Sequence, residues 1–189
     1  HGLAALAGEA KRRRLKFGLW VEPEMASVKS DFYTRHPDWV LREKARPLRK
    51  RTGREQVNLD LVNPAVREDL QGQLDALVAD VGDLAYLKWD ANANLLNLGC
   101  PSLDAAHQAN FPFDYVKGLY ELLGQLRARH PGLDIQSCAS GGGRADYGFL
   151  RYADEFWGSD DTDARERVFI QWGESLFFPA QAIGAHVTK

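Results

Sequence analysis

The chain alternates short apolar segments with amphipathic helical segments, and this order constrains its fold more than any other feature. Six segments have the length and apolar character of parallel strands covered by helices, namely residues 16–22, 57–62, 84–90, 134–139, 155–159 and 180–187. Such strand-then-helix units build either a doubly wound open sheet or an (α/β) barrel. The sequence therefore predicts an α/β protein.

The segments between the strands carry clear helix signals. Asn63 suits an N-cap and Pro64 the first helical position, and a leucine stripe then runs to a stop near Gly82. A second helix is expected over residues 113–130, a short one over 146–152 and a last one over 165–177, with a further helical pattern opening the chain at 2–14.

The position of the polar residues favours the barrel over the open sheet. No G-x-G-x-x-G follows the first strand and no G-x-x-x-x-G-K-[ST] occurs, so the nucleotide-binding sheet lacks its main signature. Polar residues stand instead at nearly every strand's carboxyl end, as in TIM barrels: Glu22, Glu24, Asp60, Lys88, Asp90, Ser137, Cys138, Asp160 and His186. We expect one domain over residues 1–189, an incomplete TIM (β/α)8-type barrel of about six parallel strands.

Composition narrows the function. The chain has 189 residues, is 44% hydrophobic and carries a net charge of −2, which argues against nucleic acid as the main partner. No apolar stretch approaches the roughly 18 residues of a membrane span. The two cysteines form no disulfide framework and, with five histidines, no zinc spacing. The chain opens at His1 in a helical pattern and stops just after an apolar segment, so both ends look cut.

Two acidic strand ends carry the chemistry. Lys88 and Asp90 follow an apolar strand and, two residues apart, point to the same face, with Trp89 on the other. The string from Phe156 to Ala164 repeats the pattern with three aspartates. A pair of carboxylates on one α/β scaffold is the equipment of a glycosidase. The long connection 25–53 is of a kind that is usually functional or covers a site.

Seven sequence motifs, taken in order, resemble those of a known protein family. The strings GLWVEPEM (18–25), HPDWVL (36–41), RxQxxLDL (54–61), KWD (88–90), SCASGGGR (137–144), SDDTDA (159–164) and GAHV (184–187) resemble the family 36 glycoside hydrolases, mostly microbial α-galactosidases. The resemblance covers nearly the whole chain. It implies a TIM barrel, of which this chain would supply strands two to seven, and a reaction that retains the anomeric configuration.

The resemblance assigns the two catalytic carboxylates. Asp90 matches the nucleophile, and Asp160 matches the general acid/base, with Asp161 as the rival. Asp163 is better explained as the cap of the helix that opens at Ala164. The family's arginine three residues after the nucleophile is replaced here by Ala93.

The resemblance also implies substrate contacts from Trp20, Arg54, Lys88, Asn92, Cys138 and Gly141. Structural alternatives stay open for most of them. Lys88 could form an ion pair with Asp90. Lys88 and Arg54 are together expected to favour the ionised form of the Asp90 carboxylate. Asn92 could be a cap or turn residue, Cys138 a small buried hydrophobe, Trp20 barrel packing, and the glycines from Gly141 a helix-entry turn.

The expected activity is cleavage of terminal α-galactosides, with an oligosaccharide as the partner, no metal, no organic cofactor, no nucleic acid and no membrane. The full-length protein is expected in the cytoplasm, and as a possible homo-oligomer. Related readings share these residues: a raffinose-synthase-like transferase, an α-N-acetylgalactosaminidase, or an inactive carbohydrate-binding homologue.

Overall fold

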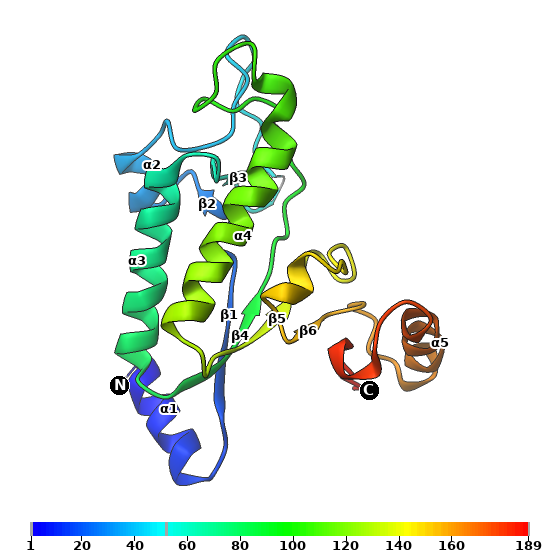
Figure 1. Cartoon of the computed structure of the whole chain (residues 1–189). Coiled ribbons are helices and arrows are strands. Elements are labelled where there is room, and N and C mark those ends of the chain that lie inside the picture. The colour runs from blue at the N-terminus through cyan, green and yellow to red at the C-terminus, as the bar shows by residue number, and fades with distance from the viewer. Residues whose placement is uncertain (1, 52, 189) are drawn as a thin grey trace. The chain divides into compact units, whose positions relative to one another are not determined.

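The computed structural model describes residues 2–51 and 53–188. These residues form two compact units, labelled by element in Figure 1. The first unit consists of His1–Val21, Val78–Asn92 and His130–Lys189, and the second of Glu22–Leu77 and Ala93–Arg129.

The first unit is built on a parallel sheet of four strands. They are β1 (Phe17–Val21), β4 (Leu84–Trp89), β5 (Asp134–Ser137) and β6 (Glu155–Phe156), hydrogen-bonded in the order β1-β4-β5-β6. Taken in chain order, each strand of this sheet therefore pairs with the next strand of the same sheet, so that new strands are always added at the same edge.

The register gives the sheet one polar and one apolar face. Lys88 lies opposite Trp20 on β1 and opposite Gln136 on β5, and Gln136 lies opposite Glu155 on β6. Side chains at these positions share one face because neighbouring parallel strands keep their pleats in phase. The alternate positions form the other face and are buried: Leu87, Trp89, Ile135 and Phe156. The predicted alternation around Trp89 is thus confirmed.

The expectation of six parallel strands was wrong for two segments. Residues 57–62 supply β3 (Gln56–Asn58), which pairs antiparallel with β2 (Met25–Ser27) in a separate sheet of the second unit. Beyond Asn58 the backbone N–H of Asp60 bonds to Trp39 O at 2.8 Å. The long connection 25–53 thus takes the hydrogen bonds that a parallel neighbour would use.

The last apolar segment, residues 180–187, forms no strand. It begins as the 3₁₀ turn η3 (Ala180–Ala182), and a single parallel bridge joins Ile183 to Phe156. Pro179 precedes the turn and accepts from Ala182 N at 2.9 Å, so the chain is already turning where a ladder would start. Strand β6 is also shorter than the predicted 155–159, since it comprises only Glu155 and Phe156.

The helices largely follow their sequence signals. They are α1 (Leu3–Arg12), α2 (Asp31–Arg35), α3 (Pro64–Val81), α4 (Phe111–Arg129) and α5 (Ala164–Ser175), with the 3₁₀ turns η1 (Gln108–Asn110) and η2 (Phe149–Arg151). Asn63 Oδ1 accepts from Ala65 N at 3.0 Å, as an N-cap should, and Gly82 beyond α3 has a φ of 77°. The helix expected over 146–152 is only η2. No described helix has the length and apolarity that crossing a bilayer requires.

The second unit packs the connection 25–53 into its core, although Thr52 lies outside the described residues. Val40 and Leu41 are fully buried, and His36 stacks on Trp39 with ring centroids 3.7 Å apart. Asp60 is also fully buried and accepts from the Cys100 thiol at 3.2 Å. Hydrogen-bonded in this way, the buried carboxylate ties the segment around Cys100 to the end of β3.

Candidate active site

Asp90 lies one residue beyond β4, on the polar side of the sheet. Its backbone N–H bonds to Val21 O at 2.9 Å, which extends the β1–β4 pairing past the last strand residue. Its side chain is almost fully buried, with 5% of the residue exposed. The position at a strand's carboxyl end is the one the sequence predicted.

Several hydrogen-bond donors surround the Asp90 carboxylate. Trp20 Nε1 donates to Oδ2 at 2.9 Å, Ala91 N donates to Oδ1 at 2.8 Å, and Ser140 N approaches Oδ1 at 3.4 Å. The Asn92 side-chain amide also donates to Oδ2. These donors come from β1, from the residues after β4 and from the loop after β5, so three strand ends meet at one carboxylate.

This environment favours the ionised form of Asp90. Burial acts to raise the pKa of the carboxyl group, but the hydrogen bonds together outweigh burial and hold that pKa below its ordinary value. The donors responsible are the Trp20 indole, the Cys138 thiol, the Asn92 amide and the Ala91 backbone N–H. An ionised carboxylate that is stabilised but not ion-paired is available to act as a nucleophile or base.

Cys138 is buried beside Asp90 and behaves as a neutral donor. Burial first, and then the negative charge of Asp90, raise the pKa of its thiol to about 12. The protonated thiol donates to the Asp90 carboxylate. The alternative in which Cys138 is a small buried side chain is confirmed, and its implied contact with the sugar stays a prediction.

Lys88 does not pair with Asp90. Its Nζ lies 3.9 Å from the ring centroid of Trp157, and within residues 2–51 and 53–188 no ion pair joins Lys88 to Asp90. The alternative in which Lys88 holds Asp90 as its ion-pair partner is therefore wrong for this structure. The hydrogen bonds from neutral groups take that role.

Asp160 stands in the loop that follows β6, and its side chain is exposed. Trp157 Nε1 donates to Asp160 Oδ1 at 2.8 Å. The neighbouring acids have local roles: Asp161 Oδ1 accepts from Asp163 N at 3.0 Å, and Asp163 caps α5 by accepting from Arg165 N and Glu166 N. The cap predicted for Asp163 is confirmed.

The loop after β5 borders both carboxylates. Ser140 and Gly141 have φ angles of 50° and 81°, and a left-handed residue pair of this kind turns the chain sharply. While Ser140 N faces Asp90, a Cβ added at Gly141 would lie 3.7 Å from Asp160 Oδ2. A Cβ at Gly142 would lie 2.0 Å from Gly158 O, so glycine is needed there for backbone packing.

The remaining predicted contacts divide between the two units. Trp20 and Asn92 meet Asp90 directly, and Asn92 Oδ1 also accepts from Ser140 Oγ at 3.2 Å. Arg54 belongs to the second unit, where its guanidinium pairs with Glu22 at 3.1 Å. Its predicted reach to the sugar stays a prediction.

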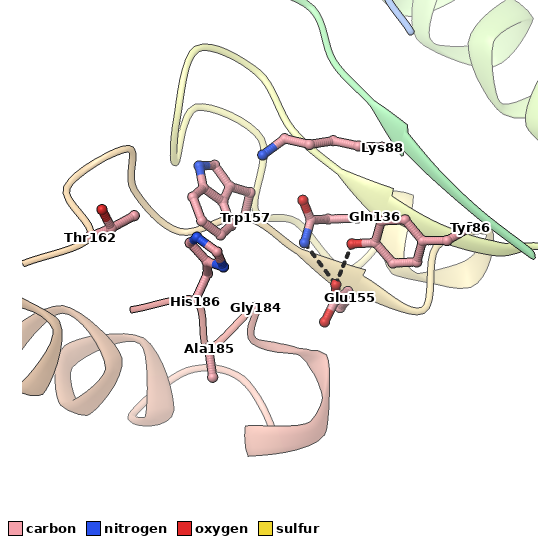
Figure 2. A pocket seen from close by; sticks show the side chains of 9 residues that line it. All are labelled: Tyr86, Lys88, Gln136, Glu155, Trp157, Thr162, Gly184, Ala185 and His186. Atoms are coloured by element: carbon pink, nitrogen blue, oxygen red, sulfur yellow. Dashed lines mark hydrogen bonds between the residues drawn. The ribbon is translucent and has the colours of Figure 1, made fainter. Parts of the chain in front are cut away.

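A cavity of about 540 Å³ opens beside the site, on the polar face of the sheet (Figure 2). Tyr86 Oη and Gln136 Nε2 both donate to Glu155 Oε1, at 2.6 and 2.7 Å. Burial and the hydrogen bond to Glu155 raise the pKa of Tyr86. The sequence analysis missed this network, although Tyr86 and Glu155 lie two residues before Lys88 and Trp157 and so share their face.

No group of three or more His, Cys, Asp or Glu side chains gathers as a metal site among the described residues. What the fold does gather is a parallel α/β sheet with two aspartates at its strand ends and a glycine loop that borders both. This arrangement defines an α/β protein whose site lies at the carboxyl ends of parallel strands.

Comparison with known proteins identifies the family. The melibiase family model matches residues 1–189, and the chain belongs to that family. Alpha-galactosidase 2 of Pediococcus pentosaceus is 44% identical over 189 residues, which are 100% of this chain and 26% of that protein.

Solved structures agree. The family 36 α-galactosidase AgaA of Geobacillus stearothermophilus superposes with a TM-score of 0.95 at 39% identity, over 100% of this chain and 26% of that one. An α-galactosidase from Lactobacillus brevis gives a TM-score of 0.94 at 38% identity, over 100% and 25%. Variants of the Geobacillus protein have been solved in complex with raffinose and with stachyose. The chain spans about a quarter of the length of these relatives.

Proposed function

We propose that the full-length protein is a retaining α-galactosidase that cleaves terminal α-galactosides by double displacement, with Asp90 as nucleophile and Asp160 as general acid/base. One observation carries the proposal. Ser140 N approaches Asp90 Oδ1 at 3.4 Å, and a Cβ at the next residue, Gly141, would lie 3.7 Å from Asp160 Oδ2, so the two carboxylates border adjacent positions of one loop. Retaining hydrolysis needs two carboxyl groups close enough to act on opposite sides of one anomeric carbon.

The environments of the two groups suit the two roles. Asp90 is buried, ionised and held by neutral donors, which leaves its charge free for attack on the anomeric carbon. Asp160 is exposed in its loop, where the oxygen of a departing group and later a water can reach it.

The reaction follows from these roles. Asp90 forms a bond to the anomeric carbon as the glycosidic C–O bond breaks, and Asp160 gives its proton to the departing oxygen. The product of this step is a β-linked galactosyl-enzyme. Asp160 then takes a proton from water, which attacks the same carbon and releases Asp90. Two inversions leave the α-configuration of the sugar unchanged.

The relatives support galactosides as the substrate class. The structures solved with raffinose and stachyose are of variants of one protein, and the match to that protein covers 100% of this chain. The raffinose complex carries an aspartate-to-asparagine substitution and the stachyose complex an aspartate-to-alanine substitution, and those two aspartates are separated by as many residues as Asp90 and Asp160. A transferase or an α-N-acetylgalactosaminidase would use the same pair, and a panel of nitrophenyl glycosides and acceptor sugars separates these activities.

We also infer that the sheet is part of a (β/α)8 barrel. In a doubly wound sheet the strand order reverses at a switch point, whereas in a barrel each strand adds to the same edge. The order β1-β4-β5-β6 shows no reversal, and the parallel bridge from Phe156 to Ile183 continues in the same direction. A crystal structure of the full-length protein with eight closed strands would support this, and an open sheet would contradict it.

The test of the catalytic proposal is chemical rescue of Asp90→Ala in the full-length protein. Loss of the nucleophile should lower turnover of an aryl α-galactoside by roughly 10³-fold or more, because the covalent route disappears. Azide should then restore release of the aryl group and give a galactosyl azide of inverted, β-configuration. Near wild-type activity of the variant, or an α-configured azide, would show that Asp90 is not the nucleophile.

A further inference from the structure

The side chain of Trp157 contacts three charged groups near the site, namely Asp160, Lys88 and Arg167. It follows β6 directly, and its backbone N–H donates to Ser137 O at 2.8 Å, which fixes it against the end of β5. Its indole Nε1 donates to Asp160 Oδ1 at 2.8 Å, while Lys88 Nζ lies over its ring at 3.9 Å. Figure 2 shows the Lys88 side chain reaching from its strand toward Trp157.

A second cation holds the same ring. The guanidinium carbon of Arg167, on α5, lies 4.6 Å from the Trp157 ring centroid, and Arg167 is buried, with 1% exposed. Arg167 also donates to Ser159 O, the residue before Asp160. Cations over an indole face attract it, so Lys88 and Arg167 restrict how the ring can turn. The N–H that reaches Asp160 is therefore aimed by groups on two other elements.

In the hydrogen bond between Trp157 and Asp160, the indole N–H can only be the donor. Indole nitrogen donates a hydrogen bond and never accepts one, so Asp160 Oδ1 has to serve as the acceptor. When Asp160 carries a proton, that proton lies on Oδ2. Once the proton has left, the N–H stabilises the negative charge that remains.

The free oxygen is the one beside the glycine loop. Asp160 Oδ2 is the oxygen that a Cβ at Gly141 would approach to 3.7 Å. Gly141 has no side chain to cover it, and the loop on which Gly141 stands also contacts Asp90 through Ser140. The proton-carrying oxygen thus lies on the side of Asp160 that faces the nucleophile's loop.

We propose that Trp157 is a positioning residue for the acid/base: it holds Asp160 by Oδ1 and so directs the transferable proton to Oδ2. The inference rests on the proposed role of Asp160. It assigns to Trp157 a function that neither the spacing of the sequence nor the comparisons assign.

The test compares Trp157→Phe with the wild type in the full-length protein. Phenylalanine keeps an aromatic face for Lys88 and Arg167 and removes the N–H. We expect turnover of raffinose, whose leaving group needs protonation, to fall about tenfold more than turnover of dinitrophenyl α-galactoside, with KM changed less than about twofold. Tenfold corresponds to about 1.4 kcal/mol, the low end for a hydrogen bond to a charged group. Trp172→Phe, at an exposed position of α5, is the matched control and should change neither rate.

A double-mutant cycle separates this inference from the proposal beneath it. On an Asp160→Ala background, Trp157→Phe should cause no further loss of selectivity between the two substrates, because the residue acts through Asp160. If Asp160→Ala alone lowers both substrates equally, the proposed role of Asp160 fails. If Asp160→Ala is selective and Trp157→Phe is not, only the positioning role of Trp157 fails.

A second substitution at Trp157 tests the same inference with less change in side-chain shape, in case Trp157→Phe disturbs folding. Replacement of Trp157 by benzothienylalanine exchanges the indole N–H for sulfur in a side chain of nearly the same shape. This variant should show the same selective loss on raffinose as Trp157→Phe. Wild-type raffinose turnover by the folded benzothienylalanine protein would overturn the inference.

Discussion

The indole Nε1 of Trp20 donates a hydrogen bond to Asp90 Oδ2 at 2.9 Å. Trp20 stands on β1 opposite Lys88, so the bond joins two neighbouring strands at their carboxyl ends. Half of the Trp20 residue is exposed, yet its one polar atom is used. Each of the two candidate catalytic carboxylates thus accepts from a tryptophan, Asp90 from Trp20 and Asp160 from Trp157.

Trp20→Phe should move the acidic limb of the pH profile to higher pH. The Trp20 bond helps hold the pKa of Asp90 below its ordinary value, so its removal raises that pKa, and Asp90 is then protonated at a higher pH as the solution is acidified. We expect a shift of about one pH unit in kcat/KM, since one unit equals about 1.4 kcal/mol and hydrogen bonds to charged groups contribute at least that much. The measurement is kcat/KM for an aryl galactoside between pH 3 and 7.

The Cys138 and Asn92 donors remain in this variant, so the shift is partial. An acidic limb that stays at the wild-type pH would show that Trp20 does not stabilise ionised Asp90, whatever its effect on KM.

Asp160→Ala should slow substrates with poor leaving groups far more than activated ones. A disaccharide leaving group requires protonation, whereas a dinitrophenolate leaves unaided, and general acid catalysis typically contributes about 10²–10⁴-fold. Turnover of raffinose should fall by roughly that factor and turnover of the activated galactoside by less than about tenfold. Asp161→Ala is the matched control, because Asp161 serves a local turn by accepting from Asp163 N. Equal losses on both substrates in Asp160→Ala, or selective losses in Asp161→Ala, would transfer the role to Asp161.

The sequence predicted the parts of this fold whose signals are local. The parallel strands β1, β4 and β5 and the helices α3 and α4 follow from apolar runs and caps. The alternation that puts Lys88 and Asp90 on one face also follows, because period two is a property of any strand.

Long-range pairing could not be predicted in the same way. Residues 57–62 have strand character, but whether Asn58 pairs in parallel or with Met25 depends on where the distant connection lies. Lys88 likewise contacts Trp157, which is 69 residues away in the chain, whereas proximity in sequence favours an ion pair with Asp90. The contacts that tune the site are those that no spacing in the sequence encodes.

Both cysteines should be nearly inert toward alkylation in the folded protein. Cys100 and Cys138 are buried, and burial together with a neighbouring carboxylate, Asp60 or Asp90, raises the pKa of each thiol to about 12. At pH 8 only about one thiol in ten thousand would then be ionised, and the thiolate is the reactive species. Iodoacetamide at pH 8, followed by peptide mass mapping, should label neither residue within a time that labels both completely in urea. Rapid labelling of Cys138 in the native protein would contradict its proposed state as a protonated donor to Asp90.

Asp163→Ala should lower stability through the first turn of α5. The Asp163 carboxylate accepts from Arg165 N at 2.9 Å and from Glu166 N at 3.2 Å, so its removal leaves both N–H groups without their cap. Loss of such an N-cap costs about 1 kcal/mol. Asp163→Asn is the matched control, because asparagine caps as well as aspartate and keeps the same geometry. Amide hydrogen exchange should speed up at Arg165 and Glu166 in the alanine variant and not in the asparagine variant. Equal losses in both would mean that the charge of Asp163 at the helix N-terminus, rather than its hydrogen bonds, provides the stabilisation.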